Sequence, residues 1–129
     1  MGTRYLLDTN TAIYFLQGVL PASSMPFMQS ILDVECNLSI ITKIELLGWQ
    51  FPSVKTESDA TDFVGASAIL GLTDDIANQV IAMRKNLKIK LPDAIIAATA
   101  LVHGFDLISR NEADFKSVPG LKLVNPFSI

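Results

Sequence analysis

Short hydrophobic runs alternate with longer amphipathic segments along the whole chain. The strand-like runs are residues 4–7, 36–41, 106–108 and 121–124, with a brief extended segment at 69–72. Helical spacing of hydrophobic positions predicts helices at residues 11–16, 21–32, 42–47, 56–69, 73–88 and 91–104. A polar turn is expected at residues 109–115. Because short hydrophobic strands that alternate with helices form parallel sheets covered on both faces, the pattern predicts an α/β fold.

The segment 91–104 is hydrophobic or small on every face, which is typical of a helix that its neighbours cover on most sides. Pro92 suits the first position of a helix, and Gly104 can take the left-handed conformation that ends one. The helix nevertheless opens with one carboxylate, Asp93. An acid in the first turn complements the helix dipole. Asp93 therefore has a structural explanation, and a functional one needs partners elsewhere in the chain.

Composition restricts the class of protein. The chain has 129 residues, of which 50% are hydrophobic and 18% are charged. These values suit a single domain over residues 1–129, with part of its apolar surface covered by a partner. The net charge of −3 argues against a general nucleic-acid binder, which would be basic. His103 is the only histidine, which excludes histidine-based zinc sites and Ser–His triads.

Other features favour a location in the cytoplasm. Cys36 is the only cysteine, so no internal disulfide can form and a reducing compartment fits. No secretory signal is expected, because Asp8 interrupts the first hydrophobic run. Residues 9–32 carry no charge, but prolines, Gly18 and polar side chains break this stretch, so we do not expect it to span a membrane.

Four acids fall at or just after the ends of predicted strands, where parallel sheets bind their ligands. They are Asp8, Glu45, Asp93 and Asp114. Structural roles are open to each of them as well. Asp8 can cap the following helix, Glu45 stands three residues after Thr42 as in a capping box, and Asp114 lies in the polar turn.

Carboxylates gathered at one sheet edge repel each other, so they either take up protons or share a cation. Ligands that are all oxygen favour Mg²⁺ or Mn²⁺, which can activate a water and polarise a phosphoryl oxygen. The chemistry that this suggests is metal-assisted phosphodiester hydrolysis. Four basic residues lie near Asp93, and they either complement a helix dipole or contact phosphate groups. They are Arg84, Lys85, Lys88 and Lys90.

Four segments together resemble the PIN domain, and in particular the VapC-type toxins of bacterial toxin–antitoxin systems. In the family's order they are residues 6–10, 41–46, 90–98 and 109–115. The most specific part is the run Leu-Pro-Asp-Ala-Ile-Ile-Ala-Ala that begins at Leu91. The resemblance covers nearly the whole chain. It implies a Rossmann-like three-layer α/β/α sandwich with a short parallel sheet, and an endoribonuclease that depends on Mg²⁺ or Mn²⁺.

The resemblance also implies roles for individual residues. Asp8, Glu45 and Asp93 match the family's acidic triad. Asp8 and Asp93 are expected to hold the metal, and Glu45 to complete its shell or orient the attacking water. The fourth site position falls on Asn111, where many members carry Asp and some carry Asn. Asp114 either compensates for this difference as a further metal ligand or anchors the loop.

The partners that the resemblance implies are an RNA substrate, a second copy of the chain and a cognate antitoxin bound over the site. Transfer RNA is among the candidate substrates. Arg84 or Lys85 is expected to meet the RNA backbone. The uncharged region 9–32 and the low overall charge are compatible with such protein contacts.

Two other functions stay open at this point. A PIN-like domain can bind RNA or a partner protein without cutting, and Asn111 leaves room for that. A phosphatase of the haloacid dehalogenase type would use Asp8 as nucleophile, with Thr42 on its phosphate. That chemistry needs a second Asp two residues after the first, where this chain has Asn10.

Overall fold

The structure is a computed structural model that describes residues 2–129. Five parallel strands form one sheet in the order β3-β2-β1-β4-β5. The strands are β1 (Tyr5–Leu7), β2 (Asn37–Ser39), β3 (Ala68–Leu70), β4 (Asp106–Ile108) and β5 (Leu123–Val124). The predicted α/β fold with a short parallel sheet is confirmed.

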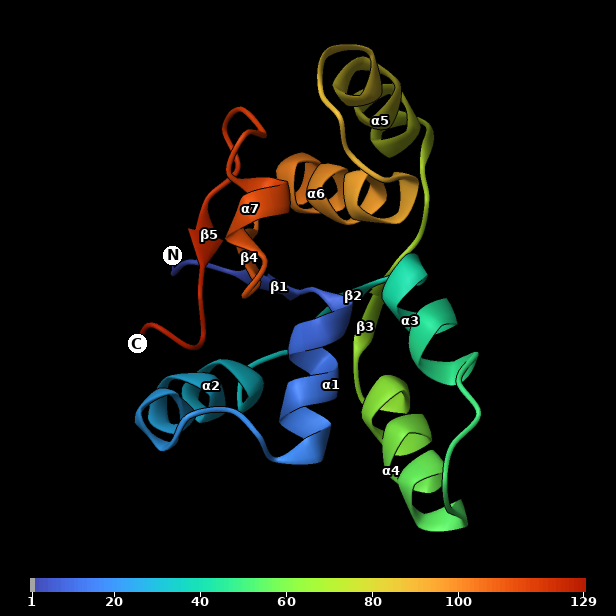
Figure 1. The fold of residues 1–129 in the computed structure, drawn as a ribbon, viewed down its shortest axis with the longest axis vertical. Coiled ribbons are helices and arrows are strands. Elements are labelled where there is room, and N and C mark those ends of the chain that lie inside the picture. The colour runs from blue at the N-terminus through green and yellow to red at the C-terminus, as the bar shows by residue number, and fades with distance from the viewer. Residues whose placement is uncertain (1) are drawn as a thin grey trace.

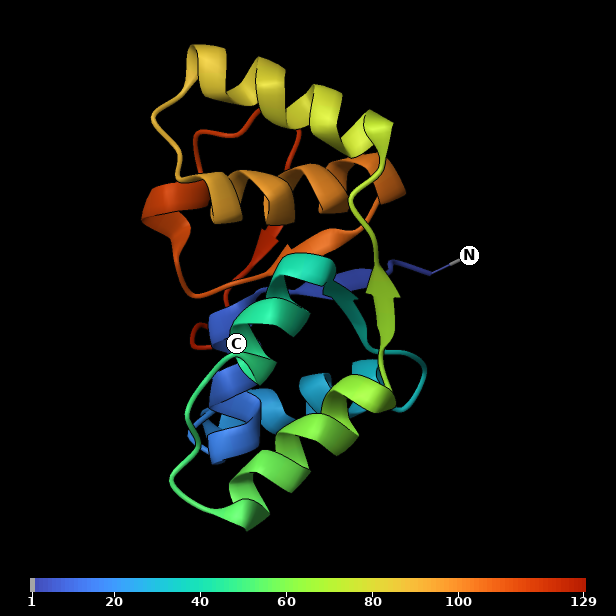
Figure 2. The ribbon, with the colours of Figure 1, turned by 90° about the vertical axis from the view of Figure 1, so that its right-hand side faces the viewer.

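Helices cover both faces of the sheet and make three layers (Figures 1 and 2). α5 and α6 lie on one face, with α5 outermost, and α1, α2 and α4 lie on the other. α3 contacts both α4 and α6 beside the β2–β3 end of the sheet. The helices are α1 (Thr9–Gln17), the 3-10 helix η1 (Ala22–Ser24), α2 (Met25–Leu32), α3 (Ile40–Leu47), α4 (Val54–Gly65), α5 (Asp74–Asn86), α6 (Leu91–His103) and α7 (Glu112–Phe115).

Neighbouring residues of the central strands bury their side chains on opposite faces of the sheet. Leu6 and Leu107 belong to the hydrophobic cluster under α5 and α6. Leu7 and Ile108 belong to the cluster that packs against α1, α2 and α4. Both faces of these strands are therefore buried, which explains why their sequence is hydrophobic throughout and does not alternate.

α6 is the buried helix that its composition predicts. Every residue from Ala94 to Ala100 is buried, against the sheet on one side and α5 on the other. The helix ends at Gly104, which has a φ of 70° and donates its backbone N–H to the last turn. Within residues 2–129, no helix combines the length and the hydrophobicity needed to cross a bilayer.

The predicted capping box at Thr42 and Glu45 is wrong. The strand expected at residues 36–41 ends at Ser39, and α3 begins at Ile40, ahead of the predicted start at Thr42. The Ser39 hydroxyl accepts the backbone N–H of Ile41 at 3.1 Å and takes the cap position. The side chains of Thr42 and Glu45 are therefore free to make contacts outside their own helix.

Several other boundaries differ from the prediction. The helix expected at 56–69 begins earlier, because Ser53 caps it, and it ends at Gly65 so that β3 can pair with β2. The segment 21–32 divides into η1 and α2. The polar turn at 109–115 contains the short helix α7, which Asn111 caps.

The packing around α6 gives a test of the core. We expect Ala97→Leu to lower the free energy of unfolding by about 1–3 kcal/mol, because Ala97 is fully buried and a larger side chain would overpack the helix. Val102 lies on the exposed side of the same helix. As the control, Val102→Leu should change the value by less than about 0.5 kcal/mol. Urea unfolding followed by circular dichroism measures both, and equal stabilities would contradict the packing.

Candidate functional site

The order of strands reverses beside β1, because β2 lies on one side of it and β4 on the other. In parallel α/β sheets, ligands bind at such a reversal, beyond the carboxyl ends of the strands. A cavity of about 100 Å³ opens there. It is lined by Asp8, Thr9, Asn10, Glu45, Asp93, Ile96 and Asn111. Segments from four distant parts of the sequence therefore meet at one edge of the sheet.

Asp8 follows β1 directly and is only 4% exposed. One carboxylate oxygen, Oδ1, accepts the backbone N–H of Thr11 at 2.8 Å and caps α1. The other, Oδ2, accepts the hydroxyl of Ser109 at 2.6 Å. The expected capping role of Asp8 is confirmed, and the cap fixes the carboxylate at the wall of the cavity.

Thr9 holds Glu45 in place. Its hydroxyl donates to Oε1 of Glu45 at 2.7 Å and lies 3.0 Å from the hydroxyl of Thr42. Glu45 is thereby tied to the first turn of α1, beside Asp8. Sequence reasoning did not single out Thr9. The available signal was its position, directly after an acid that ends a central strand.

Asp93 lies in the first turn of α6, half-buried, and caps nothing with its side chain. Burial raises the pKa of its carboxyl, and the charges of Asp114, Asp8 and Glu45 raise it further. The charge of Lys90, which precedes the helix, lowers this pKa. The environment of Asp93 thus disfavours its ionised form.

The pKa of Asp8 is also raised, mainly because the carboxyl is buried. The hydrogen bonds from Ser109 and Thr11 oppose that effect, and the charge of Glu45 adds to it. Among residues 2–129, the ion pairs are Arg4–Glu35 and Lys55–Asp59, and neither involves an acid of the cavity. The acids therefore repel each other without a paired basic side chain, and a bound cation would relieve the repulsion.

Asn111 and Asp114 are joined to each other. The amide of Asn111 donates to Oδ2 of Asp114 at 2.7 Å, and its Oδ1 accepts the Asp114 backbone N–H. Asn111 lines the cavity, whereas Asp114 does not; Asp114 holds the Asn111 amide, and its charge raises the pKa of Asp93. Ser109, which was also not singled out, is fully buried and accepts the backbone N–H of Asn111. It connects this loop to Asp8.

The residues suit a hydrated cation and not a closed metal cage. In the described part of the chain, no three side chains of His, Cys, Asp or Glu lie close enough to ligate one ion together. Mg²⁺, however, keeps several of its waters and needs only one or two protein carboxylates. Asp8 and Asp93 supply oxygen ligands of this kind, and the cavity between them is polar and small.

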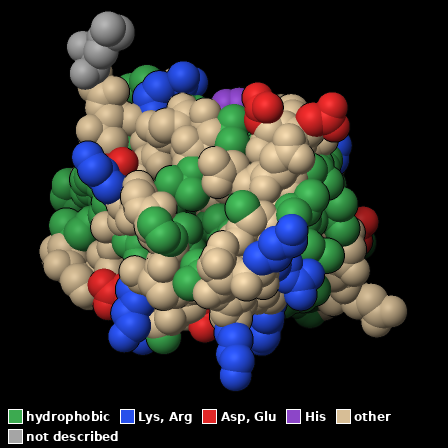
Figure 3. All heavy atoms as spheres, turned by 90° about the horizontal axis from the view of Figure 1, so that it is seen from above, with side chains coloured by type: hydrophobic (Ala, Val, Ile, Leu, Met, Phe, Trp, Pro, Cys, Tyr) green, Lys and Arg blue, Asp and Glu red, His purple; other side chains and the backbone are tan. Residues whose placement is uncertain are grey.

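Arg84 and Lys85 do not reach the cavity. They are exposed in the last turn of α5, and neither lines it. Figure 3 looks down on the side of the molecule that α5 covers, and it shows Lys and Arg side chains in separate groups with hydrophobic side chains between them. This face offers separate groups of basic side chains and no continuous basic surface.

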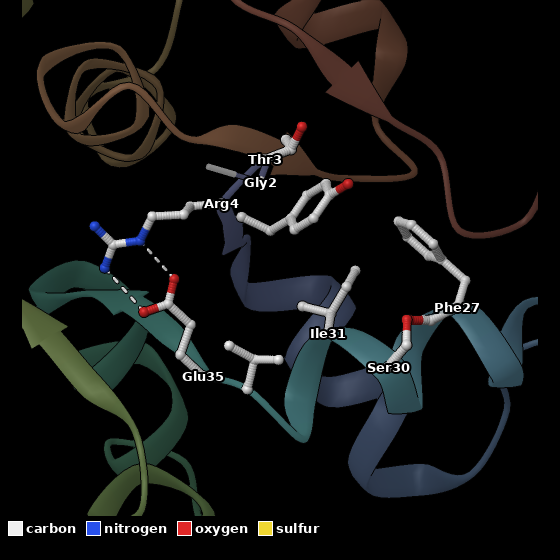
Figure 4. Close-up of a pocket in the computed structure, with 9 residues that line it drawn as sticks. Gly2, Thr3, Arg4, Phe27, Ser30, Ile31 and Glu35 are labelled. Atoms are coloured by element: carbon white, nitrogen blue, oxygen red, sulfur yellow. Dashed lines mark hydrogen bonds and ion pairs between the residues drawn. The ribbon is translucent and has the colours of Figure 1, made fainter.

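A larger cavity, of about 550 Å³, lies at the other end of β1 (Figure 4). Arg4 and Glu35 meet there in a two-bond ion pair, at 2.7 and 2.9 Å, beside Phe27 and Ile31. Their charges neutralise each other, and the remaining lining is mostly apolar. The charged side chains of the larger cavity are therefore paired, whereas the acids of the smaller cavity have no basic partner among residues 2–129, and the smaller one is the better candidate site.

Comparison with known proteins gives the family and the fold. The PIN domain family model matches residues 5–121. A chain of a toxin–antitoxin complex from Klebsiella pneumoniae is 31% identical, with 97% of this chain and 99% of that chain covered and a TM-score of 0.74. No curated protein matches significantly.

Two further solved structures share the fold at lower identity. A chain of VapBC2 from Rickettsia felis, bound to a DNA fragment from its promoter, is 23% identical, with 95% and 98% of the two chains covered and a TM-score of 0.80. A chain of FitAcB from Neisseria gonorrhoeae is 24% identical, with 97% and 99% covered and a TM-score of 0.78.

The raised pKa of Asp93, which burial and the neighbouring acids cause together, predicts the effect of Asp93→Asn. A carboxyl whose pKa is raised by folding favours the folded state below its unfolded pKa, and this contribution is lost as the pH rises through the folded pKa. At pH 7 and in EDTA, Asp93→Asn should therefore raise Tm. The expected rise is only roughly 2 °C, because solvent screens part of the repulsion that the substitution removes. At a pH below about 3.5, near the unfolded pKa, the gain should disappear.

Thermal unfolding followed by circular dichroism measures this effect. The control is Asp75→Asn, in the exposed first turn of α5, where the carboxylate complements the helix dipole. That variant should leave Tm unchanged or lower it. Added Mn²⁺ should raise the Tm of the original protein more than that of Asp93→Asn. A lower Tm for Asp93→Asn at pH 7 would show that the acids do not strain the fold.

Proposed function

The chain belongs to the PIN domain family, and we propose that residues 1–129 form one domain that acts as a metal-dependent endoribonuclease, the toxin of a toxin–antitoxin pair. The observation that carries the proposal is the group of Asp8, Glu45 and Asp93 around one cavity, with no basic side chain among residues 2–129 paired to them. The family match favours a nuclease over the phosphatase alternative.

Asp8 and Asp93 are the proposed ligands of Mg²⁺ or Mn²⁺. When bound, such an ion polarises a phosphoryl oxygen and lowers the pKa of a water. Ser109 and Thr11 hold the Asp8 carboxylate in one orientation. Asp93 keeps its position because the buried helix behind it is rigidly packed.

Glu45 and Asn111 are proposed to act on the attacking water and on the phosphate. Thr9 occupies Oε1 of Glu45, which leaves Oε2 to accept a proton from the water. Asn111 uses one amide N–H on Asp114 and keeps the other for a phosphate oxygen or a water. Hydrolysis of the phosphodiester then follows from an oriented water and a phosphate that is held in place.

The proposed protein partners are a cognate antitoxin and a second copy of the chain. The relative from Klebsiella pneumoniae is part of a toxin–antitoxin complex, which supports the first of these. Large hydrophobic side chains also stand exposed on α3 and the loop after it. They include Ile44 at 60% and Trp49 at 51% exposure, and Val54, the first residue of α4, follows at 87%. A partner would cover such side chains.

Cleavage of a transfer RNA pool by the purified protein tests the nuclease proposal. We expect cleavage with Mn²⁺ and none in EDTA. Asp8→Asn and Asp93→Asn should each slow it by more than about 100-fold, beyond the loss expected of residues that only support a ligand. Asp75→Asn, an equal change of charge away from the cavity, should keep full activity.

Three results would weigh against the nuclease proposal or replace it. Equal cleavage in EDTA, or full activity of Asp93→Asn, would overturn it. Binding of Mn²⁺ without cleavage of any RNA would favour the alternative of a binding domain that does not cut. Circular dichroism of each variant shows whether a loss of activity reflects a loss of folding.

Growth measurements test the toxin role separately. Induced expression in a bacterial host should stop growth, whereas Asp93→Asn at the same protein level should not. If a small reading frame neighbours the gene, its co-expression should restore growth and yield a complex that purifies as one species. Normal growth with active, soluble protein present would contradict the toxin role and leave the nuclease activity standing.

A further inference from the structure

The guanidinium of Arg110 is held by two aromatic rings, next in sequence to Asn111 of the acidic cavity. Its guanidinium lies 4.1 Å from the centre of the Phe127 ring and 5.9 Å from that of Tyr14. The two rings meet edge to face, with their centres 5.2 Å apart. Arg110 is exposed, and within residues 2–129 it makes no ion pair with a carboxylate. Aromatic rings and not an acid therefore hold this guanidinium.

The fold brings these three residues together at the edge where the acids lie. Arg110 stands between Ser109, which binds Asp8, and Asn111, which lines the cavity. β5 runs parallel to β4, so the segment after β5 leaves the sheet at the same edge and carries Phe127 there. The turn at Asn125, whose Oδ1 accepts the Phe127 N–H at 2.9 Å, sets the direction of that segment.

The way in which Arg110 is held suits the binding of an anion. A guanidinium that stacks on rings uses its flat face and keeps the N–H groups at its edge available for phosphate oxygens. An Arg paired with a carboxylate would have used those groups already. The rings also restrict the side chain before any ligand arrives, which lowers the entropy cost of binding.

A polyanion that approaches this site needs such a cation. The chain has a net charge of −3, and the cavity itself is lined by acids. Arg110 does not line the cavity, so a phosphate bound by its guanidinium would be a neighbour of the phosphate held in the cavity.

We propose that Arg110 binds a phosphate of the RNA strand that flanks the phosphate to be cleaved, with Tyr14 and Phe127 as its positioning residues. This inference rests on the proposed ribonuclease function. It assigns the contact to a residue at the site edge, in place of Arg84 or Lys85 on α5.

RNA binding without cleavage tests the inference. The fluorescence anisotropy of a short labelled single-stranded oligouridine is measured in EDTA at several salt concentrations. Arg110→Gln should weaken binding about tenfold and reduce the slope of log K against log salt by about 0.7, the value for one phosphate contact on a single strand. Arg110→Lys should keep the slope but bind more weakly, because an ammonium makes one contact in place of two.

Matched variants separate this contact from general effects. Lys122→Gln removes one positive charge directly before β5, at the opposite edge of the sheet, and should leave both Kd and slope unchanged. Phe127→Leu keeps the charge and much of the hydrophobic bulk but removes the ring, and it should weaken binding with the slope retained. Thermal unfolding of each variant reports on folding.

Three results would contradict the inference, and they differ in what they leave of the proposed function. If the original protein binds the oligouridine and Arg110→Gln binds it with the same Kd and slope, the inference is wrong and the proposed function stands. A lower Tm with a changed Kd but an unchanged slope for Arg110→Gln would also overturn it, because Arg110 would then only anchor the C-terminal segment. If the original protein neither binds nor cleaves RNA, the proposed function fails, and this inference fails with it.

Discussion

The hydrogen bond from Ser109 to Asp8 joins the ends of β1 and β4 at the edge of the sheet where the acids meet. A carboxylate as deeply buried as that of Asp8 is costly to ionise unless donors surround it. Ser109 supplies one donor from the end of β4, and Thr11 supplies another from the first turn of α1. One side chain therefore links β1, α1 and β4. The remaining residues of the cavity are positioned relative to this carboxylate, since Thr9 follows it and holds Glu45.

This anchoring has an electrostatic consequence. Asp8 cannot turn away from Glu45 and Asp93, because both of its oxygens are engaged. Asp93 cannot move away either, because α6 is buried from Ala94 to Ala100 and its first turn is fixed by that packing. The free energy of the core thus holds together carboxylates that would otherwise separate. Burial is the main cause of the raised pKa of Asp8 and of Asp93, and the charges of neighbouring acids raise both further. Functional sites commonly reduce the stability of the fold around them in this way.

The sequence was sufficient to predict features that depend on local pattern. The parallel sheet, the burial of α6 and the presence of acids at one sheet edge follow from short hydrophobic runs, from the composition of residues 91–104 and from the position of each acid after a strand. It was not sufficient for contacts between distant segments. Thr9 and Glu45 are 36 residues apart, and Asp8 and Ser109 are 101 residues apart. The error at Thr42 has the same origin, because Ser39 and Thr42 both suit a helix start and the pairing of β2 with its neighbours decides between them.

Net charge was the least informative of the sequence measures for function, and the reason is the range of electrostatic forces. Salt at physiological strength screens charges over about 8 Å, so a ligand at the cavity responds to the few charges near it and not to the total. Near the cavity, Lys90 lies close enough to Asp93 to lower its pKa, and Arg110 is held by rings next to Asn111. Under the proposed function, the acids bind a cation, and these two basic residues, which do not line the cavity, are available to the phosphates of the strand. An acidic protein can therefore bind a polyanion where its fold places basic side chains next to, and apart from, the acids of its site.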